Sequence, residues 1–408
     1  MRVALYTLGC KVNQYETQKI AEDFRSHGFE IVKFSEHADV YVINTCTVTQ
    51  TADSKSRQAA RAAVKRNPEA AVIITGCYAD TSPEQLKKIE GVNLVIGNEG
   101  KENLAELVLK SLAVDVKIRN PQSAIRNVRT RALLKIQDGC DQYCSYCAVP
   151  LARPVMSNRP QAEVIYEAKE LADNGYKEIV LTGIRLGRYE NGLSDLLAEL
   201  ADIQGIERIR LSSIELTDIP DDLIALMSEN KKICRHLHIP LQSGDNDVLA
   251  RMNRPYTAEE FASFVEEARL QVPGIAITTD IMIGFPGETE EQFENTFKFA
   301  DCVKFARTHV FRFSSRPGTA AALFKNTVME CEKARRSRLL MEQAAKHQHE
   351  FACGLIGKNM PVLVESKCSG LTDNYVRVIL DGAAGAGEIV DVRIENVTRG
   401  TASGKVIE

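Results

Sequence analysis

The 408-residue sequence has no apolar run that approaches the ~18 residues of a membrane-spanning helix, so we expect no membrane partner. Its N-terminus, MRVALYTLGCKVNQ, lacks the cleavage pattern of a signal peptide, and no low-complexity tract is present. The formal net charge is only −4, which excludes binding of polyanions through bulk positive charge. At about 150 residues per domain, these absences predict a globular, cytoplasmic protein of two to four domains.

Cysteine, by contrast, is abundant, with 11 residues in a chain without a secretory signal. In a reducing compartment, ligands, nucleophiles and small buried residues are more common roles for cysteine than disulfides. Because free cysteine is among the most buried residue types, we expect five isolated cysteines to be packing residues: Cys234, Cys302, Cys331, Cys353 and Cys368. The other six form two groups of three, which are Cys10, Cys46 and Cys77, and Cys140, Cys144 and Cys147.

Residues 1–115 alternate apolar runs, such as RVALYTLG, VYVINT and AVIITG, with helix-like stretches. This alternation predicts an α/β domain with an open parallel sheet that is covered on both faces. Cys10, Cys46 and Cys77 each follow one of these strands directly. Since the carboxyl ends of parallel strands line the ligand crevice, we expect the three thiols to share a site. Three unrelated loop cysteines are the alternative.

Residues 116–132 are predicted to be a linker. The surrounding sequence, VDVKIRNPQSAIRNVRTR, contains Pro121 and Ser123 and is rich in basic side chains. Its basic residues are Lys117, Arg119, Arg126, Arg129 and Arg131. The segment is either a solvated connector or a cationic strip that contacts phosphates.

Residues 133–352 contain a second series of strands. The runs are LLKIQ, EIVLTG, RIRLSS, HLHIPLQ, ITTDIMIG and THVFRFS, with helices between them. Six β/α units in this length predict a partial barrel, smaller than the closed eightfold barrel of about 250 residues. In such folds the chemistry lies on the loops that follow the strands.

Residues 353–408 differ from the rest, because short strands are separated by glycine-rich turns. This pattern predicts a small antiparallel β-barrel. The segment contains six Lys and Arg against seven Asp and Glu, so bulk charge does not favour RNA. If it binds RNA, we expect local geometry around Tyr375 and Arg377 to be responsible.

The segment DGCDQYCSYC places Cys140, Cys144 and Cys147 in a C-x3-C-x2-C array after the first barrel strand. Three soft thiolates on one loop suit three corners of an iron–sulfur cluster. No fourth cysteine follows closely, so one iron would be open to another ligand. Tyr146 could pack beside that ligand. A zinc loop with a distant fourth ligand and a ferredoxin-like electron carrier are the alternatives.

This C-x3-C-x-aromatic-C loop resembles that of the radical S-adenosylmethionine enzymes, in which S-adenosylmethionine chelates the open iron. GCKVNQYET, VINTCTVT and ITGCYA resemble the methylthiotransferase domain, whose three cysteines hold a second [4Fe–4S] cluster. LTDNYVRV resembles the RNA-binding TRAM domain. The resemblance covers essentially the whole chain. It implies a methylthiotransferase domain at 1–115, a (β/α)6 radical barrel at 133–352 and a TRAM-like barrel at 353–408.

Within this family, CKVNQYE at 10–16 and TDNYVRV at 372–378 are most similar to the branch that modifies N6-threonylcarbamoyladenosine at tRNA position 37. The resemblance implies that a 5′-deoxyadenosyl radical removes the C2 hydrogen, the second cluster supplies sulfur, and a second S-adenosylmethionine supplies the methyl group. It implies that all six patterned cysteines ligate metal. The implied partners are the tRNA anticodon loop, an external electron donor, and an iron–sulfur assembly or sulfur-donor system.

Two alternatives stay open for the function. The same chemistry could act on isopentenyladenosine-37 tRNA or on a ribosomal-protein aspartate. A non-enzymatic, two-cluster electron-transfer protein with an RNA-binding tail would need no cleavage of S-adenosylmethionine.

Residues at the ends of the barrel strands are the candidate contacts to S-adenosylmethionine or substrate, and no catalytic side chain is assigned. With Tyr146, the candidates are Gly183, Ser213, Glu215, Gln242, Ser243, Ile283 and Gly284. Ordinary turn structure at a barrel end is the alternative for each. His236 and His238 share one face of a strand, and we expect both to be structural.

Overall fold

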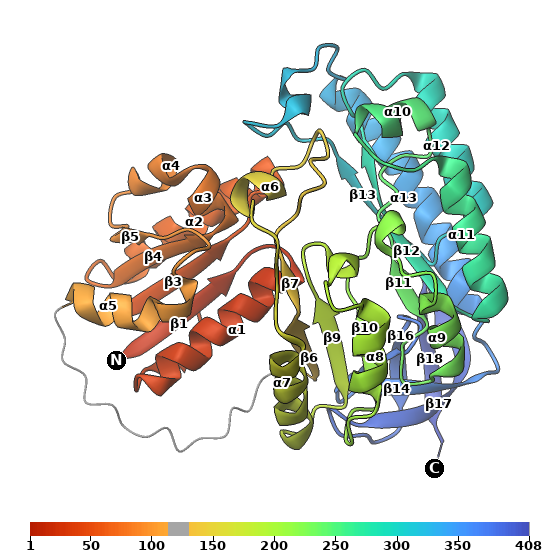
Figure 1. Cartoon of the computed structure of the whole chain (residues 1–408), viewed down its shortest axis with the longest axis horizontal. Helices are drawn as coiled ribbons and strands as arrows, with labels where there is room; N and C mark the ends of the chain where they lie inside the picture. Colours follow the sequence, from red (N-terminus) through yellow and green to blue (C-terminus); the bar gives the residue numbers. More distant parts are fainter. Residues whose placement is uncertain (113–129, 408) are drawn as a thin grey trace. The chain divides into compact units, whose positions relative to one another are not determined.

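The computed structural model describes residues 1–112 and 130–407 (Figure 1). The chain divides into two compact units. Of the described residues, the first unit comprises 1–112, 138–157 and 314–322, and the second comprises 130–137, 158–313 and 323–407. Of the predicted basic linker, only residues 130–132 are among those described, so Lys117, Arg119, Arg126 and Arg129 lie outside them.

The first unit contains a five-stranded sheet in the order β2-β1-β3-β4-β5, and every pairing is parallel. The strands are β1 (Arg2–Thr7), β2 (Glu30–Val32), β3 (Val40–Thr45), β4 (Ala71–Gly76) and β5 (Leu94–Val95). The helices are α1 (Lys11–Ser26), α2 (Gln50–Arg66), α3 (Cys77–Thr81), α4 (Pro83–Lys87), α5 (Leu104–Leu112) and α6 (Val149–Ala152), with a 3-10 turn at Lys101–Asn103. The predicted open parallel sheet is confirmed.

Successive residues of these strands pack into two cores, one on each face of the sheet. In β3, Tyr41 and Ile43 belong to the core that includes residues of α2, α3 and α4. Val40 and Val42 belong to the core that includes residues of α1 and α5. Because helices cover both faces, all six residues of β4 are buried, which explains the unbroken apolar run in the sequence.

The second unit contains the barrel strands in two parallel sheets, β10-β9-β6 and β11-β12-β13. Two isolated β-bridges connect these sheets. Ile209 of β10 pairs with Ile233, which precedes β11, and Ser213, which follows β10, pairs with His238 of β11. The strands are β6 (Arg131–Lys135), β9 (Glu178–Thr182), β10 (Arg208–Leu211), β11 (His236–His238), β12 (Ala276–Ile283) and β13 (Arg307–Arg312). The six strands therefore follow one another in chain order, and the predicted partial barrel is confirmed.

Helices separate the barrel strands along the chain (Figure 1). They are α7 (Gln161–Asp173), α8 (Leu193–Ala201), α9 (Leu223–Glu229), α10 (Asn246–Arg251), α11 (Ala258–Gln271), α12 (Glu290–Val303) and α13 (Glu330–Cys353), with 3-10 turns at Leu186–Arg188, Leu216–Asp218 and Ala320–Leu323. The short strands β7 (Gln137–Asp138) and β8 (Ser157–Asn158) pair where the chain enters and leaves residues 138–157. Among the described residues, no helix is both long and apolar enough to span a bilayer.

β12 separates the apolar and polar faces of the barrel. Ile277 and Ile281 pack in the large core with residues of the surrounding helices. Thr278 and Asp280 alternate with them and instead contact His238, at 2.9 Å from Thr278 Oγ1 to Nδ1 and 3.2 Å from Asp280 Oδ2 to Nε2. The face of β12 that points away from the core is therefore polar.

The C-terminal residues form a closed barrel in the order β14-β15-β16-β18-β17. The strands are β14 (Asn359–Ser366), β15 (Ser369–Thr372), β16 (Arg377–Asp381), β17 (Ile389–Thr398) and β18 (Thr401–Val406). The expected small barrel is confirmed, but it is not wholly antiparallel, because β16 pairs with β18 in parallel. Strand directions cannot alternate around a closed ring of five, so one parallel pair is unavoidable.

Buried arginines attach this small barrel to the start of the large barrel's strands. Arg210 is 1% exposed, and its Nε donates to Glu178 Oε1 at 2.8 Å. Its two Nη atoms donate to the carbonyl oxygens of Asp373 and Thr372, at 2.9 and 3.1 Å. Burial alone would raise the pKa of Glu178, but the charge and hydrogen bond of Arg210 and the charges of Arg131 and Arg208 together outweigh burial, and the pKa is lowered. The ion pair therefore stays charged in the interior.

Substitution Arg210→Ala should lower the free energy of unfolding by about 3–5 kcal/mol, because Glu178 is left as an uncompensated buried charge. Urea unfolding monitored by circular dichroism measures the change. Lys298→Ala removes an exposed i,i+4 pair with Glu294 and should cost less than about 1 kcal/mol. Equal losses in the two variants would contradict the prediction.

Candidate functional site

The first group of cysteines lies at one edge of the first unit's sheet. Cys10 precedes α1, Cys46 follows β3, and Cys77 is the first residue of α3, directly after β4. Because β1, β3 and β4 are neighbours and run in parallel, these three chain ends meet. The structure thus brings the three cysteine segments together: Gly9, which precedes Cys10, lies against Cys46, and α3, which begins at Cys77, contacts β3, which Cys46 follows.

Glycine is required beside these cysteines. Gly9 has a φ of +107°, and a Cβ added there would lie 2.8 Å from Cys46 Cβ and 2.9 Å from Asn13 Nδ2. Gly76 has a φ of +96° and turns the chain from β4 into Cys77. Side chains at either position would displace the segments that carry the thiols.

Asn13 joins two of the three cysteine segments. Its buried Nδ2 donates to the carbonyl oxygens of Leu8 and Thr45, at 2.8 and 2.9 Å. These carbonyls lie within two residues of Cys10 and Cys46. The backbone carbonyl of Asn13 accepts from Asn44 Nδ2 at 3.0 Å, which fixes α1 against the end of β3.

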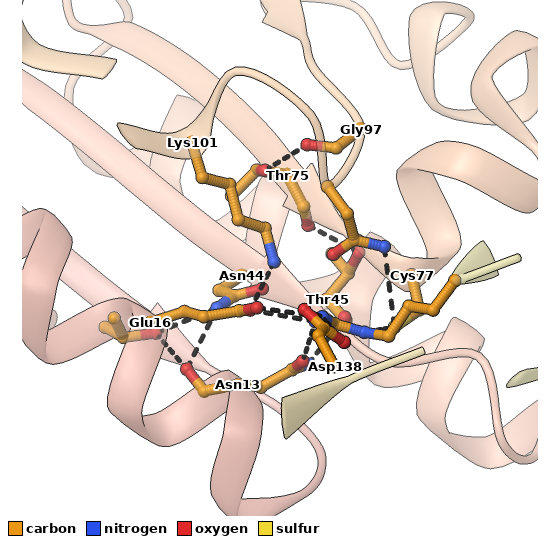
Figure 2. A network of polar contacts seen from close by, with 12 residues as sticks. Asn13, Glu16, Asn44, Thr45, Thr75, Cys77, Gly97, Lys101 and Asp138 are labelled. Carbon is orange, nitrogen blue, oxygen red and sulfur yellow. Dashed lines mark hydrogen bonds and ion pairs between the residues drawn. The ribbon is translucent and has the colours of Figure 1, made fainter. Parts of the chain in front are cut away.

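The network beside Cys77 includes Asn13, Glu16, Lys101 and Asp138 (Figure 2). At its centre, Arg153 donates from Nε to Cys77 Sγ at 3.5 Å and from Nη1 to Asp138 Oδ1 at 2.7 Å. Lys101 pairs with Glu16 on the other side. Burial is the largest influence and lowers the pKa of Arg153, but the hydrogen bond to Glu16 and the charges of the surrounding acidic groups together outweigh burial and raise that pKa. Burial lowers the pKa of Lys101.

The second group of cysteines lies on a tight loop in residues 138–157, which belong to the first unit. The backbone N–H of Cys147 donates to the carbonyl of Cys144 at 3.0 Å, and the N–H of Cys140 donates to the carbonyl of Arg153 at 3.3 Å. All three thiols of this group are half-buried. The loop leads into α6, which contacts α3, the helix that begins at Cys77.

Both groups of thiols fit iron–sulfur ligation by their chemistry. Backbone N–H groups point at sulfur in each, at 3.5 Å from Val48 N to Cys46 Sγ, 3.5 Å from Gln142 N to Cys140 Sγ and 3.4 Å from Val149 N to Cys147 Sγ. Such hydrogen bonds stabilise metal-bound thiolates. In the metal-free fold, burial raises the pKa of Cys10 and raises that of Cys46 to about 12, so these thiols are protonated.

No three Cys, His, Asp or Glu side chains in residues 1–112 and 130–407 are arranged to hold a single metal ion. In a cubane cluster each cysteine binds a different iron, so the sulfurs stand further apart than they do around one ion.

Among the barrel-end candidates, Gln242 shows the clearest sign of a ligand contact. Its φ is +69°, and its backbone pairs with Asp280 and Met282 at 2.8 and 2.9 Å. Its side-chain Oε1 is buried and has no hydrogen-bond partner within the described chain. Buried amide oxygens are nearly always paired, so this atom fits a bound polar group.

Other candidates already have partners within the fold. Ser243 is fully buried, with its Oγ 3.1 Å from Thr296 Oγ1 and accepting from the N–H of Asp245 at 3.2 Å. Glu215 forms an ion pair with Arg254. These contacts favour the turn-structure alternative for both residues.

The remaining candidates lie in different surroundings. A Cβ on Gly183 would lie 3.1 Å from Gln137 Oε1, and the backbone N–H of Gly284 donates to Glu288 Oε2 at 2.8 Å. Ser213 is exposed and Ile283 is fully buried. Tyr146 is half-buried in the cysteine loop.

The two histidines of β11 contact the same hydroxyl group, that of Thr278. His236 Nε2 and His238 Nδ1 lie 3.0 and 2.9 Å from Thr278 Oγ1, and the ring of His236 stacks on Tyr375 with centroids 4.2 Å apart. Both histidines therefore have hydrogen-bond partners within the fold, which fits the structural role that we expect.

The expectation for the five isolated cysteines was only partly right. Cys234 is 2% exposed and Cys353 is half-buried. Cys302, Cys331 and Cys368 are exposed, so the prediction of buried packing residues is wrong for them. Cys302 and Cys331 lie on the solvent-facing sides of α12 and α13, where helical periodicity could have revealed it.

Sequence reasoning missed Asn13, Glu16, Asp138 and Arg153 as site residues. Cys10 is the N-cap of α1, and Asn13 and Glu16, three residues apart, are neighbours on the first turns of this helix. That spacing was a usable signal. No local sequence pattern indicated Arg153, because its contact with Cys77 joins residues 76 positions apart.

Comparisons with known proteins bear on the same residues. Family models match at residues 2–97 (Uncharacterized protein family UPF0004), 134–300 (Radical SAM superfamily) and 355–407 (TRAM domain). The structure of the radical S-adenosylmethionine methyltransferase TsrM from Kitasatospora setae superposes with a TM-score of 0.59 at 18% identity, covering 79% of this chain and 77% of that one. Fold, cysteine loop and family match together define a radical S-adenosylmethionine enzyme.

Two curated relatives narrow the class. Threonylcarbamoyladenosine tRNA methylthiotransferase MtaB of Bacillus subtilis (strain 168) is 41% identical over 96% of this chain and 93% of its own length. The tRNA-2-methylthio-N(6)-dimethylallyladenosine synthase of Endomicrobium trichonymphae is 32% identical over 94% of each. The chain belongs to the methylthiotransferase family of radical S-adenosylmethionine enzymes. It is therefore a transferase that uses S-adenosylmethionine and a [4Fe–4S] cluster.

Substitution Asn13→Ala should lower the free energy of unfolding of the metal-free protein by about 2 kcal/mol or more, because two buried carbonyl groups lose their donor. Thermal or urea unfolding under anaerobic, chelated conditions measures the loss. Asn174→Ala removes an exposed amide that caps its own helix and should change stability by only about 0.5 kcal/mol. A stable Asn13→Ala variant would show that Asn13 does not join the cysteine segments.

Proposed function

We propose that this chain converts N6-threonylcarbamoyladenosine at tRNA position 37 to its 2-methylthio derivative. The observation that carries the proposal is the 41% identity, over nearly the full length of both chains, to a relative named for this substrate. Identity to the relative named for dimethylallyladenosine is lower, at 32%. The C-terminal match to the TRAM domain supports an RNA substrate, and position 37 lies in a loop whose bases a protein can splay out.

We further propose two [4Fe–4S] clusters, one on Cys140, Cys144 and Cys147 and an auxiliary cluster on Cys10, Cys46 and Cys77. The chemistry needs them because the C2–H bond of adenine is not acidic, so no side-chain base near neutral pH can remove that proton. When bound, the first cluster and S-adenosylmethionine supply a radical that breaks the bond, and the auxiliary cluster supplies sulfur. An external electron donor and a sulfur-donor system are then required partners.

The chain's own residues position these groups. The N–H groups of Val48, Gln142 and Val149 point at cysteine sulfurs and favour the ligating thiolates. Gln242 offers a buried, unpaired Oε1 to S-adenosylmethionine, and the barrel-end candidates other than Ser243 and Glu215, whose side chains have partners within the fold, remain proposed contacts. In this proposal, residues 1–115 hold the auxiliary cluster, residues 133–352 bind S-adenosylmethionine and substrate, and residues 353–408 bind RNA.

Substitution Cys46→Ala should lower the iron content of anaerobically reconstituted protein from about eight to about four per chain, since one of two four-iron clusters is lost. Formation of 5′-deoxyadenosine should persist in Cys46→Ala and disappear in Cys144→Ala. Cys234→Ala is the matched control, because Cys234 is equally buried and belongs to neither group. Full iron in Cys46→Ala would contradict the auxiliary site.

The substrate is tested by nucleoside mass spectrometry of tRNA from a strain that lacks this protein. The 2-methylthio derivative of threonylcarbamoyladenosine should disappear and its unmodified parent accumulate, and expression of the wild-type chain should reverse both changes. Selective loss of 2-methylthio-isopentenyladenosine would instead assign the other tRNA substrate. Normal levels of both would contradict a tRNA substrate.

A further inference from the structure

All five N–H donors of Arg153 have acceptors in the first unit. Nη1 donates to Glu16 Oε1 at 2.8 Å and to Asp138 at 2.7 Å. Nη2 donates to Glu16 Oε2 at 2.9 Å and to Asn13 Oδ1 at 3.1 Å. The fifth donor, Nε, points at Cys77 Sγ at 3.5 Å. The planar guanidinium therefore cannot rotate away from the sulfur without breaking bonds on its other edge.

The charged groups around this guanidinium fix its orientation, with the two carboxylates on the edge away from sulfur. Glu16 and Asp138 hold the Nη edge, and Lys101 pairs with Glu16 from the far side. The side chain of Arg153 is only 2% exposed, so water screens its charge little. The nearest group left for the Nε edge is Cys77, which also accepts from Asn98 Nδ2 at 3.9 Å.

We propose that Arg153 is a positioning residue that raises the reduction potential of the auxiliary cluster through its charged N–H···S contact with Cys77. The inference rests on the proposed function, because it requires a cluster on Cys10, Cys46 and Cys77. Reduction adds negative charge to a cluster that already bears three thiolates. A fixed cation and a hydrogen bond to one of those sulfurs stabilise the reduced form more than the oxidised form.

Arg153 also links the two cysteine groups. Its backbone carbonyl accepts from the N–H of Cys140, while its side chain contacts Cys77. One residue thus touches a ligand-bearing segment of each proposed cluster. A purely structural arginine would hold these segments together but would leave the potential of a correctly loaded cluster unchanged, and this difference makes the two roles separable.

The test uses the full chain in a Cys140→Ala, Cys144→Ala, Cys147→Ala background, in which only the auxiliary cluster can form. The protein is reconstituted anaerobically with iron and sulfide. Iron content, the electron paramagnetic resonance spectrum after reduction, and the midpoint potential from a spectroscopic redox titration are then compared. Arg153→Gln removes the positive charge. Arg153→Lys keeps the charge but lacks the planar set of guanidinium donors. Arg2→Gln is the matched control, since it removes one positive charge at the opposite end of β1.

Arg153→Gln should retain about four irons per chain. Its reduction equilibrium should fall about tenfold, which is a shift of about 59 mV to more negative potential for a one-electron couple. The resonance spectrum should change as well. Arg153→Lys should shift the potential in the same direction by less, and Arg2→Gln should match the parent.

A loaded Arg153→Gln variant with the parent's potential and spectrum would overturn the inference. If Arg153→Gln takes up no iron, Arg153→Lys decides: a lower potential supports the inference, and an unchanged one overturns it. Loss of iron from both variants would assign Arg153 to cluster retention and also overturn the tuning role. Failure of the parent itself to take up iron would refute the proposed auxiliary cluster, independently of Arg153.

Discussion

The carboxyl ends of β1, β3 and β4 meet at one edge of the first unit's sheet, and the arrangement of the cysteines depends on this constraint. In the pairing of β3 with β4, Thr45 lies opposite Gly76. Cys46 and Cys77 follow these two residues, so both start from strands about 4.8 Å apart. Parallel pairing thus gathers thiols that are far apart in the sequence, and the glycines and Asn13 only refine their positions.

This is also why much of the molecule could be predicted from its sequence. Unbroken apolar runs marked strands buried on both faces, and the position of Cys10, Cys46 and Cys77 after such strands needed no knowledge of side-chain contacts. The parallel pairing of β16 with β18 could not be predicted locally, because it follows from closing a ring of five strands. Arg153 was equally inaccessible, because its partners come from α1, β7 and α3.

The buried charges around Cys77 call for a physical reason. Removing Arg153, Glu16, Asp138 and Lys101 from water costs free energy that their mutual attraction barely returns, so apolar residues of similar volume would often be as stable. A network of this kind is therefore weak evidence for stability. Its value lies in electrostatics: it fixes a positive charge within 3.5 Å of a thiol at the sheet edge, where a mobile or hydrated cation would have little effect.

The second unit separates its C-terminal barrel, which matches the TRAM domain, from its candidate binding residues. Arg208, Arg210 and Arg235 hold the C-terminal barrel at the amino ends of the large barrel's strands, whereas Gln242 and its neighbouring candidates lie at the carboxyl ends. β12 alone is eight residues long, which is about 26 Å at roughly 3.3 Å per residue. A substrate that contacts both ends must span at least that length. On the proposed function the C-terminal barrel contacts RNA; a free nucleoside is too short to reach both ends, whereas a folded RNA with a protruding loop is long enough.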